Sequence, residues 1–325
     1  MSHDTAVGYG PGVSTATRPG GAPMFTRLAG SAALLATGAD AVDFLHGQLA
    51  NDVKGLRDGG AVRSLLLNHK GHAMAEAQVL RFEQSRLALI VDDGQGAWVR
   101  ETLERHIVFD EVKLEPVDCV VLTVQGVADG ALGALSAQPP AEGEWLAIGP
   151  SGHAYRTART AAGGYDVTFL GPEAGGLAAE AEAALTAAGA VAADEAALDA
   201  ARVAGLVPAA GREGGEGVLP QEAGLEGLVS FRKGCYLGQE IMARIEARGS
   251  VRRGLVALEL SGEPAGREVT LDGKVVGRLG TVARLPDGGL GALAVLRQDV
   301  ADAGRLSVGP QATARVVRAA RMMPT

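Results

Sequence analysis

The stretch Phe231-Arg-Lys-Gly-Cys-Tyr-Leu-Gly-Gln-Glu-Ile-Met-Ala-Arg-Ile-Glu-Ala-Arg-Gly249 bears most directly on the fold and function of this chain. Gly234 and Gly238 flank a Cys-Tyr-Leu tripeptide, so the backbone around the cysteine can turn freely. The segment from Gly238 to Ala247 is predicted to be a helix because apolar side chains recur on one face, at Ile241, Met242 and Ile245. Cys235 therefore precedes a helix N-terminus.

Cys235 is the candidate nucleophile of the chain. A helix N-terminus and the neighbouring cations of Arg232 and Lys233 both stabilise a thiolate, which is the reactive form of cysteine. The alternative is a small hydrophobic side chain buried in the core, and the residues alone leave both interpretations open. Cys119, in contrast, lies in the apolar run 117–124 and is interpreted as a core residue.

The chain changes character after Gly249. Short alternating segments follow one another there, with Gly and Pro between them, and this pattern predicts a small all-β unit, either a barrel or a sandwich. The expected strands are Leu255–Leu260, Val269–Leu271, Lys274–Ala283, Leu290–Val295 and Ala312–Val317.

The region before the signature mixes strands and helices without a regular βαβ alternation, which favours the α+β class. Strands are expected at Ala61–Leu67, Ala73–Phe82, Arg86–Val91, Val112–Val117, Val120–Val124, His153–Thr157 and Tyr165–Leu170. Helices are expected at Ala39–Leu49, Gln95–His106, Gly175–Ala188 and Asp194–Ala204. The glycine-rich stretch Pro208–Gly217 is expected to be a loop.

Bulk composition limits the possible functions. The chain has 325 residues, which fits two or three packed units, and 47% of them are hydrophobic. A net charge of −8 disfavours general binding to nucleic acid or to anionic membranes. Two cysteines cannot build a disulfide framework or a four-cysteine site, and the six histidines show no metal-ligand spacing. We expect no metal site.

The sequence also gives an expectation about the cellular location of the protein. No apolar run reaches the roughly 20 residues that a membrane span needs. Residues 1–23 are rich in Gly, Pro, Thr and Ala and lack the apolar stretch of a signal peptide, so they are interpreted as a flexible tail. We therefore expect a cytoplasmic protein with no membrane partner.

The segment Lys233-Gly-Cys-Tyr-Leu-Gly-Gln-Glu240 resembles the K-G-C-Y-x-G-Q-E signature of YgfZ-type, folate-binding relatives of the glycine-cleavage T protein. Three further segments resemble the same relatives: the lead-in 219–231, the segment Phe44–Asp52 and the turn Asn68–Gly71. The resemblance runs from about Leu34 to the C-terminus. It makes Cys235 and Lys233 the candidate catalytic residues, within a motif that also contains Gly234, Tyr236, Gly238, Gln239 and Glu240.

The resemblance implies a GcvT/YgfZ-like architecture of three parts. Residues 24–250 would form two α+β portions, one of them ferredoxin-like, around a central opening, and residues 251–325 would form a β-barrel. It also implies tetrahydrofolate or a derivative in that opening. The implied role is the assembly or maintenance of iron–sulfur proteins, with effects on tRNA-modifying enzymes and with those proteins or their assembly factors as partners.

The chain departs from the aminomethyltransferase branch of these relatives at the turn Gly71–Glu76. Ala75 and Glu76 stand where that branch carries paired aspartates, which weakens an aminomethyltransferase interpretation. The stretch Thr160–Asp166 keeps only part of a second family pattern, and both tryptophans lie outside the segments where some relatives stack a pterin.

Four residues are the expected folate contacts: Asp52, Lys70, Tyr165 and Arg244. Each has a structural alternative. Asp52 can cap a helix or a turn, and Lys70 can be merely solvated. Arg244 can hold an anionic folate tail or can pair with Glu240. Tyr165 would offer a flat surface for a pterin in place of tryptophan.

Three functional hypotheses follow. The first is a tetrahydrofolate-binding accessory protein for iron–sulfur proteins that acts through Cys235. The second is a folate-dependent aminomethyltransferase, and the third is a scaffold whose signature docks a partner without chemistry. Whether the chain is an enzyme stays open at this point.

Overall fold

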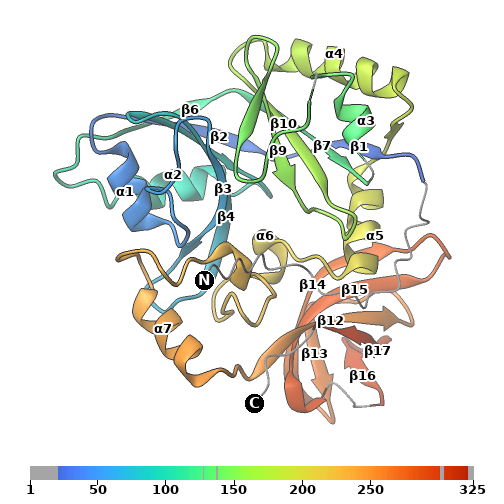
Figure 1. Ribbon diagram of the computed structural model, residues 1–325. Helices are drawn as coiled ribbons and strands as arrows, with labels where there is room; N and C mark the ends of the chain where they lie inside the picture. The colour runs from blue at the N-terminus through green and yellow to red at the C-terminus, as the bar shows by residue number, and fades with distance from the viewer. Residues whose placement is uncertain (1–20, 127, 137, 301–303, 321–325) are drawn as a thin grey trace, which may run out of the picture.

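The computed structural model describes residues 21–126, 128–136, 138–300 and 304–320. Three β-sheets organise the chain, and two of them carry helices (Figure 1). Residues 1–20 of the expected N-terminal tail lie outside the described part. No helix in the described part is both long and apolar enough to cross a membrane.

The first α+β portion is built on a five-stranded antiparallel sheet with the strand order β3-β4-β5-β2-β6. The strands are β2 (Ala32–Thr37), β3 (Ala61–Leu67), β4 (Ala73–Glu83), β5 (Arg86–Val91) and β6 (Lys113–Val117). Helices α1 (Ala41–Gln48) and α2 (Gly96–Glu104) cover one face. Because side chains alternate along a strand, Val79 and Leu89 point to these helices and pack with Leu45 and Val99.

The second α+β portion is a six-stranded sheet with the order β11-β1-β7-β10-β9-β8. Its strands are β1 (Met24–Arg27), β7 (Cys119–Gln125), β8 (Trp145–Ile148), β9 (Gly152–Thr157), β10 (Gly164–Leu170) and β11 (Val191–Ala192). Helices α3 (Asp129–Leu132) and α4 (Ala174–Ala187) cover its outer face. Alanines of α4, such as Ala178 and Ala181, let this helix lie close to Val167 and Phe169.

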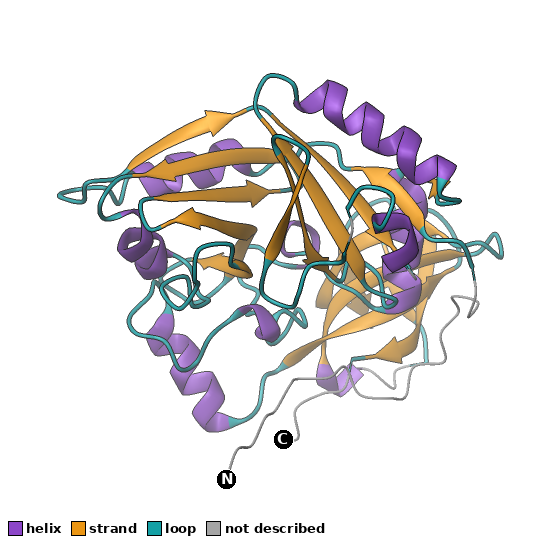
Figure 2. Cartoon of the chain, turned by 45° about the horizontal axis from the view of Figure 1, so that its top comes forward, coloured by secondary structure: helices purple, strands orange, loops and turns teal. Residues whose placement is uncertain are grey.

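The two sheets pack face to face, so the α+β region is layered as helix, sheet, sheet, helix (Figure 2). Leu80 and Ile90 of the first sheet share a buried cluster with Val121 and Tyr155 of the second. Trp145 also crosses the interface, because its indole N–H donates to the carbonyl of Arg81 at 2.9 Å. The two portions therefore share one apolar layer.

The third part is a closed six-stranded barrel with the order β12-β15-β14-β13-β16-β17. Its strands are β12 (Arg253–Leu260), β13 (Glu268–Leu271), β14 (Lys274–Arg284), β15 (Leu290–Arg297), β16 (Leu306–Val308) and β17 (Ala312–Ala319). Between β15 and β16 the described residues contain only the short 3₁₀ helix η2 (Gln298–Val300). The predicted α+β class with a C-terminal β-barrel is thus confirmed.

Helices α5 (Glu195–Gly205) and α6 (Ala210–Glu213) join the barrel to the rest of the chain. The fully buried carboxylate of Glu213 accepts hydrogen bonds from Arg202 of α5 at 2.9 Å and from the backbone and hydroxyl of Thr281 in β14, both at 2.7 Å. It also accepts from the backbone N–H of Ala209 at 2.7 Å. The expected loop 208–217 therefore contains one helical turn, because this long-range network holds it.

Candidate functional site

Lys233 anchors the signature loop to the first α+β portion. Its ammonium donates hydrogen bonds to the carbonyls of Leu49 at 2.6 Å and Asn51 at 3.1 Å, and also to the carbonyl of His46. These groups lie at and just beyond the C-terminal end of α1, where carbonyls lack partners within the helix. Lys233 is only 8% exposed. Burial lowers its pKa to about 8, although the nearby Asp52 carboxylate opposes this shift.

Tyr236 forms a second anchor. The centre of its ring lies 5.0 Å from the Lys233 ammonium, which is within the range of a cation–π contact. The ring is 7% exposed and packs in a cluster with Leu65, Leu67 and Met242. Two side chains of the signature therefore point into the protein.

The glycines of the signature allow a close contact between two turns. Gly238 has a φ of +85°, and a Cβ at this position would lie 2.7 Å from the carbonyl oxygen of Asn68. Gly71 has a φ of +76°, and its added Cβ would lie 2.8 Å from the Met242 side chain. Any larger residue would push the signature away from the turn Asn68–Gly71, so both glycines are required by geometry.

Cys235 lies between the two buried anchors and is exposed. Helix α7 (Gln239–Arg248) begins after Gly238, which confirms the predicted helix and places Cys235 three residues before its N-cap. The ammonium of Lys233, however, is held by the carbonyls near the end of α1. The signature thus presents one thiol outward from a segment that is fixed at the residues on either side.

The expected folate contacts are spread over several places. Asp52 closes a turn by accepting from the backbone N–H of Gly55 at 2.9 Å. The ammonium of Lys70 lies 3.6 Å from the Glu216 carboxylate. Arg244 pairs with Glu240 one turn earlier in α7. The alternatives to folate binding were a turn cap for Asp52 and an ion pair with Glu240 for Arg244. The structure shows both of these contacts.

Tyr165 lies in the core of the second α+β portion. It is 1% exposed, and its hydroxyl donates to the carboxylate of Asp129. Burial, followed by the hydrogen bond to Asp129, raises the pKa of this hydroxyl to about 12. The Tyr165 ring therefore offers no open face in this structure on which a pterin would stack.

A cluster of charged side chains lies where the two α+β portions meet. Arg159, in the turn between β9 and β10, binds both carboxylate oxygens of the buried Asp166, with its Nη2 2.6 Å from the nearer one. The same Nη2 also donates to Asp92, just after β5, at 2.6 Å. Although burial opposes it, these two carboxylates raise the pKa of Arg159 well above its usual value.

A second ion pair extends the charged cluster into the first sheet. Arg63 of β3 donates to Glu76 of β4 at 2.8 Å. Asp92 accepts from the hydroxyl of Ser31 at 2.6 Å. Burial opposes the shift, yet the Arg159 guanidinium holds the pKa of Asp92 below its usual value.

We call the hollow beside this cluster the central pocket. It has a volume of about 40 Å³ and is lined by both α+β portions together with α5 and α6: Leu28, Ala29, Arg63, Glu76, Asp92, Asp93, Ala158, Arg159, Glu195, Leu198, Asp199, Arg202, Pro208, Ala209 and Arg212. Among the residues expected from sequence to bind folate, none lines it, and neither does Cys235. Glu76, in β4, is the one lining residue to which the sequence had drawn attention, because it stands where the aminomethyltransferase branch carries an aspartate.

These features define an α+β protein in which two sheet-and-helix portions, with α5 and α6, line a charged pocket, and which also carries a C-terminal barrel and an exposed cysteine within its signature. Residues 30–233 match the GCVT N-terminal domain family. This match covers more than half of the chain, and the chain therefore belongs to that family.

Relatives of this chain include aminomethyltransferases and tRNA-modifying proteins named YgfZ. An aminomethyltransferase from Halalkalibacterium halodurans is 27% identical over 267 residues, which cover 77% of this chain and 72% of the relative. The tRNA-modifying protein YgfZ from Serratia proteamaculans is 39% identical over 107 residues, covering 30% of this chain and 32% of the relative. The YgfZ protein from Edwardsiella ictaluri is 44% identical over 91 residues, covering 25% and 28%. The YgfZ matches thus span about a third of those proteins or less.

A solved structure supports the fold assignment. The glycine cleavage system aminomethyltransferase T from Bartonella henselae superposes with a TM-score of 0.76, covering 91% of this chain and 85% of that one, at 19% sequence identity. At this level of identity the similarity establishes a shared fold.

We predict that the two cysteines differ sharply in reactivity. Cys235 is exposed, whereas burial raises the pKa of Cys119 to about 11. Ellman's reagent at neutral pH should label one thiol per native chain rapidly and the second only after unfolding. Cys235→Ser should abolish the rapid phase, and Cys119→Ala should retain it. Rapid labelling of native Cys235→Ser protein would contradict the assignment.

A second prediction concerns pH and the Lys233 anchor. The folded pKa of Lys233, about 8, lies below its unfolded value, so the unfolded chain binds more protons between these two pKa values. Lys233 should therefore increase the free energy of unfolding as pH rises from about 8 toward about 10.5.

Urea unfolding of the wild type and of Lys233→Met across this range measures that contribution as the difference between the two curves. Because Met cannot donate to the carbonyls near the end of α1, the variant should be less stable at every pH and should lack the rise. Lys54→Met serves as the control, since Lys54 is an exposed lysine whose partner is Asp43. Parallel pH profiles for the wild type and Lys233→Met would refute the prediction.

Proposed function

We propose that this protein binds a reduced folate in the central pocket and serves as an accessory protein for the assembly or maintenance of iron–sulfur proteins, with Cys235 as its working group. The observation that carries the proposal is the exposed thiol held between two buried anchors, Lys233 and Tyr236. Membership of the GCVT family and the relatives named tRNA-modifying protein YgfZ support the same direction.

The chemistry of the central pocket fits a folate. The edge of a pterin ring offers adjacent N–H donors, which a carboxylate such as Glu76 or Asp92 accepts in pairs. The carboxylates of a folate tail match guanidinium groups, and Arg212 stands at this pocket beside Asp93. A reduced folate, when bound, would supply a carrier for one-carbon groups.

The size of the pocket sets a condition on binding. A volume of about 40 Å³ admits a water molecule but not a pterin. The ion pair between Arg159 and Asp92 joins the two α+β portions across this pocket. We infer that folate binding separates the Arg159 guanidinium from the Asp92 carboxylate. Polar groups of the folate then pair with these two side chains, which pair with each other when no folate is bound.

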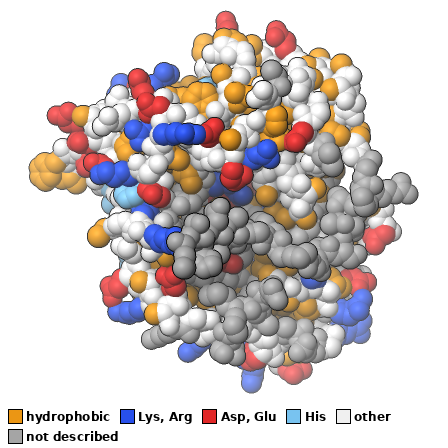
Figure 3. All heavy atoms as spheres, viewed as in Figure 1, with side chains coloured by type: hydrophobic (Ala, Val, Ile, Leu, Met, Phe, Trp, Pro, Cys, Tyr) orange, Lys and Arg blue, Asp and Glu red, His pale blue; other side chains and the backbone are white. Residues whose placement is uncertain are grey.

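Cys235 has a separate task in this proposal. It lies outside the lining of the central pocket and is exposed to partners. A thiolate is both a nucleophile and a ligand for iron, so an exposed thiol on a fixed loop can meet a client protein directly. On the face shown in Figure 3, basic and acidic side chains are interspersed and form no continuous basic stripe, which suits a protein client better than bulk nucleic acid.

An aminomethyltransferase is the second candidate function. It is favoured by the relative of that name, which matches 77% of this chain. Two features of the segment Gly71–Glu76, which runs from a turn into β4, count against it: Ala75 replaces one aspartate, and the Glu76 carboxylate is held by Arg63. Transfer of the methylene carbon of an aminomethyl donor to tetrahydrofolate, with release of its nitrogen as ammonia, would favour this candidate.

We predict that tetrahydrofolate binds saturably in isothermal titration calorimetry and that Glu76→Gln weakens binding by at least about tenfold, because a charge-assisted hydrogen bond to the ligand is lost. Glu83→Gln is the matched control, since Glu83 is an exposed glutamate at the end of the same strand. Variants Lys70→Gln and Arg244→Gln, together with a salt series, test whether exposed cations hold the folate tail. Unchanged affinity in Glu76→Gln would place the pterin elsewhere, and no binding at millimolar ligand would favour the docking scaffold.

A cellular test addresses Cys235. In cells that lack the gene, wild-type protein should restore the activity of an iron–sulfur enzyme, and Cys235→Ser should fail to do so. The variant should unfold close to the wild-type temperature, because an exposed single-atom replacement has little effect on stability. Cys119→Ala should restore activity. Full restoration by Cys235→Ser would exclude the thiol as the working group.

A further inference from the structure

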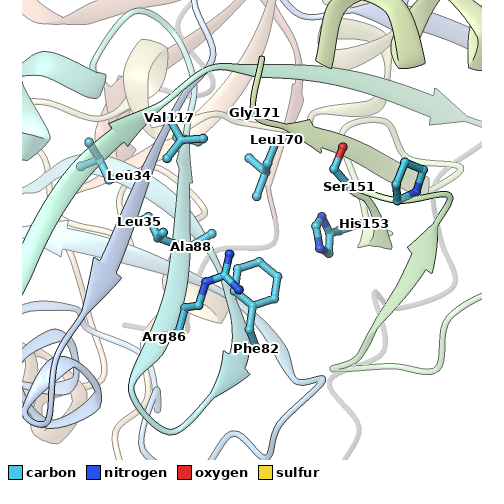
Figure 4. Close-up of a pocket in the computed structure, with 12 residues that line it drawn as sticks. Leu34, Leu35, Phe82, Arg86, Ala88, Val117, Ser151, His153, Leu170 and Gly171 are labelled. Carbon is cyan, nitrogen blue, oxygen red and sulfur yellow. The ribbon is translucent and has the colours of Figure 1, made fainter. Parts of the chain in front are cut away.

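A second cavity lies between the two sheets, away from the residues that line the central pocket. It has a volume of about 270 Å³, just below the usual range for ligand pockets. Strands β2, β4, β5 and β6 supply one wall, and residues around β9 and the end of β10 supply the other (Figure 4). Its lining is mostly apolar and includes Ala33, Leu35, Ala88, Val117 and Leu170.

Arg86 gives this cavity a positive charge. Its guanidinium carbon lies 5.2 Å from the centre of the Phe82 ring, and the group reaches in among the lining side chains (Figure 4). Within the described part of the chain, Arg86 makes no ion pair with an acidic residue and no side-chain hydrogen bond. A guanidinium that stacks on an aromatic ring keeps its N–H groups available for a planar anion.

His153 completes the polar part of the cavity without adding a second charge. Its ring packs against Phe82 and Trp145, with centroid distances of 4.9 and 4.8 Å. Burial, and to a lesser degree the charge of Arg86, lowers the pKa of His153, so the ring is neutral at neutral pH. Among the lining residues, Arg86 is then the one with a charged side chain at that pH.

We propose that this cavity binds a small organic acid with a single carboxylate and an apolar, aromatic or branched body. The carboxylate pairs with the guanidinium of Arg86, and the body fills the space between Leu170 and the strands of the first sheet. Arg86 is the one charged side chain among the lining residues, so the site selects a monoanion over a neutral molecule of similar shape, because only the anion forms charge-assisted hydrogen bonds with the guanidinium.

Such a ligand would contact both α+β portions at once. Ala88 and Val117 belong to the first sheet, whereas His153 and Leu170 belong to the second. A molecule bound between them stabilises the packed arrangement, so its binding should raise the unfolding temperature in a concentration-dependent way.

The test uses benzoate as the probe and the fluorescence of Trp145 as the readout. The second tryptophan, Trp98, is removed by Trp98→Phe in all proteins compared, so the signal reports the ring that packs against His153. We expect a saturable change with benzoate in the millimolar range. Benzyl alcohol, which has a similar shape but no charge, should bind at least about tenfold more weakly.

Arg86→Gln should weaken benzoate binding by at least about tenfold while the protein stays folded, because Arg86 is an exposed residue with no acidic partner among the described residues. Arg105→Gln is the matched control, since Arg105 is an exposed arginine of the same portion that pairs with Glu101. The proposal is overturned if benzoate gives no saturable change, if Arg86→Gln binds it as tightly as the parent protein, or if benzyl alcohol binds as tightly as benzoate.

Discussion

The guanidinium of Arg159 is the interaction on which the centre of this protein depends. It binds Asp166 within its own portion and Asp92 across the interface. Removing such a group from water is costly, and only several well-aligned hydrogen bonds offset that cost. Two carboxylates on one arginine provide them, so the two portions are held in a defined relation while a polar pocket is kept at their junction. Loss of Arg159 would leave buried Asp166 without its cation, which is more damaging than loss of a surface ion pair.

The signature segment divides its residues between structure and chemistry. Lys233 and Tyr236 face inward, Gly238 allows close contact with a neighbouring turn, and Cys235 faces outward. This division explains why a run of small, aromatic and basic residues surrounds a single thiol. A cysteine on a loose loop would sample many positions, whereas this one is fixed relative to α1. The barrel, in turn, is joined to the α+β region through Glu213, so that all three parts are tied together by buried polar contacts.

Much of the fold was predictable because alternation along strands is a local signal. The strands Ala61–Leu67 and Arg86–Val91 agree with prediction to the residue. Strand β2 was missed because Ala32–Thr37 is almost wholly apolar; it is a central strand, with Leu34 facing the helices and Ala33 facing the other sheet. Periodicity alone does not distinguish such a run from a buried helix.

The candidate site was predictable only in part. The helix that follows Cys235 was visible in its apolar spacing, whereas the residues alone left open whether Cys235 is buried or exposed. The role of Lys233 as a buried anchor was not visible in the sequence, since its carbonyl acceptors lie more than 180 residues earlier in the chain. The pairing of Arg159 with Asp92 likewise joins two strand ends that are 67 residues apart. Tyr165 looked available as an aromatic surface, but its position in β10 turns it into the core.

The distance in sequence between Lys233 and helix α1 also has a consequence for the order of events during synthesis. The family match ends at residue 233, the same lysine that donates to the carbonyls at the end of α1. On the ribosome, those carbonyls lack the Lys233 ammonium until this residue emerges, although the carbonyl of Asn51 can already accept from the nearby backbone N–H of Val53. The end of α1 therefore acquires this buried cation only after the strands of both α+β sheets have been synthesised, which makes the signature a late addition to the domain.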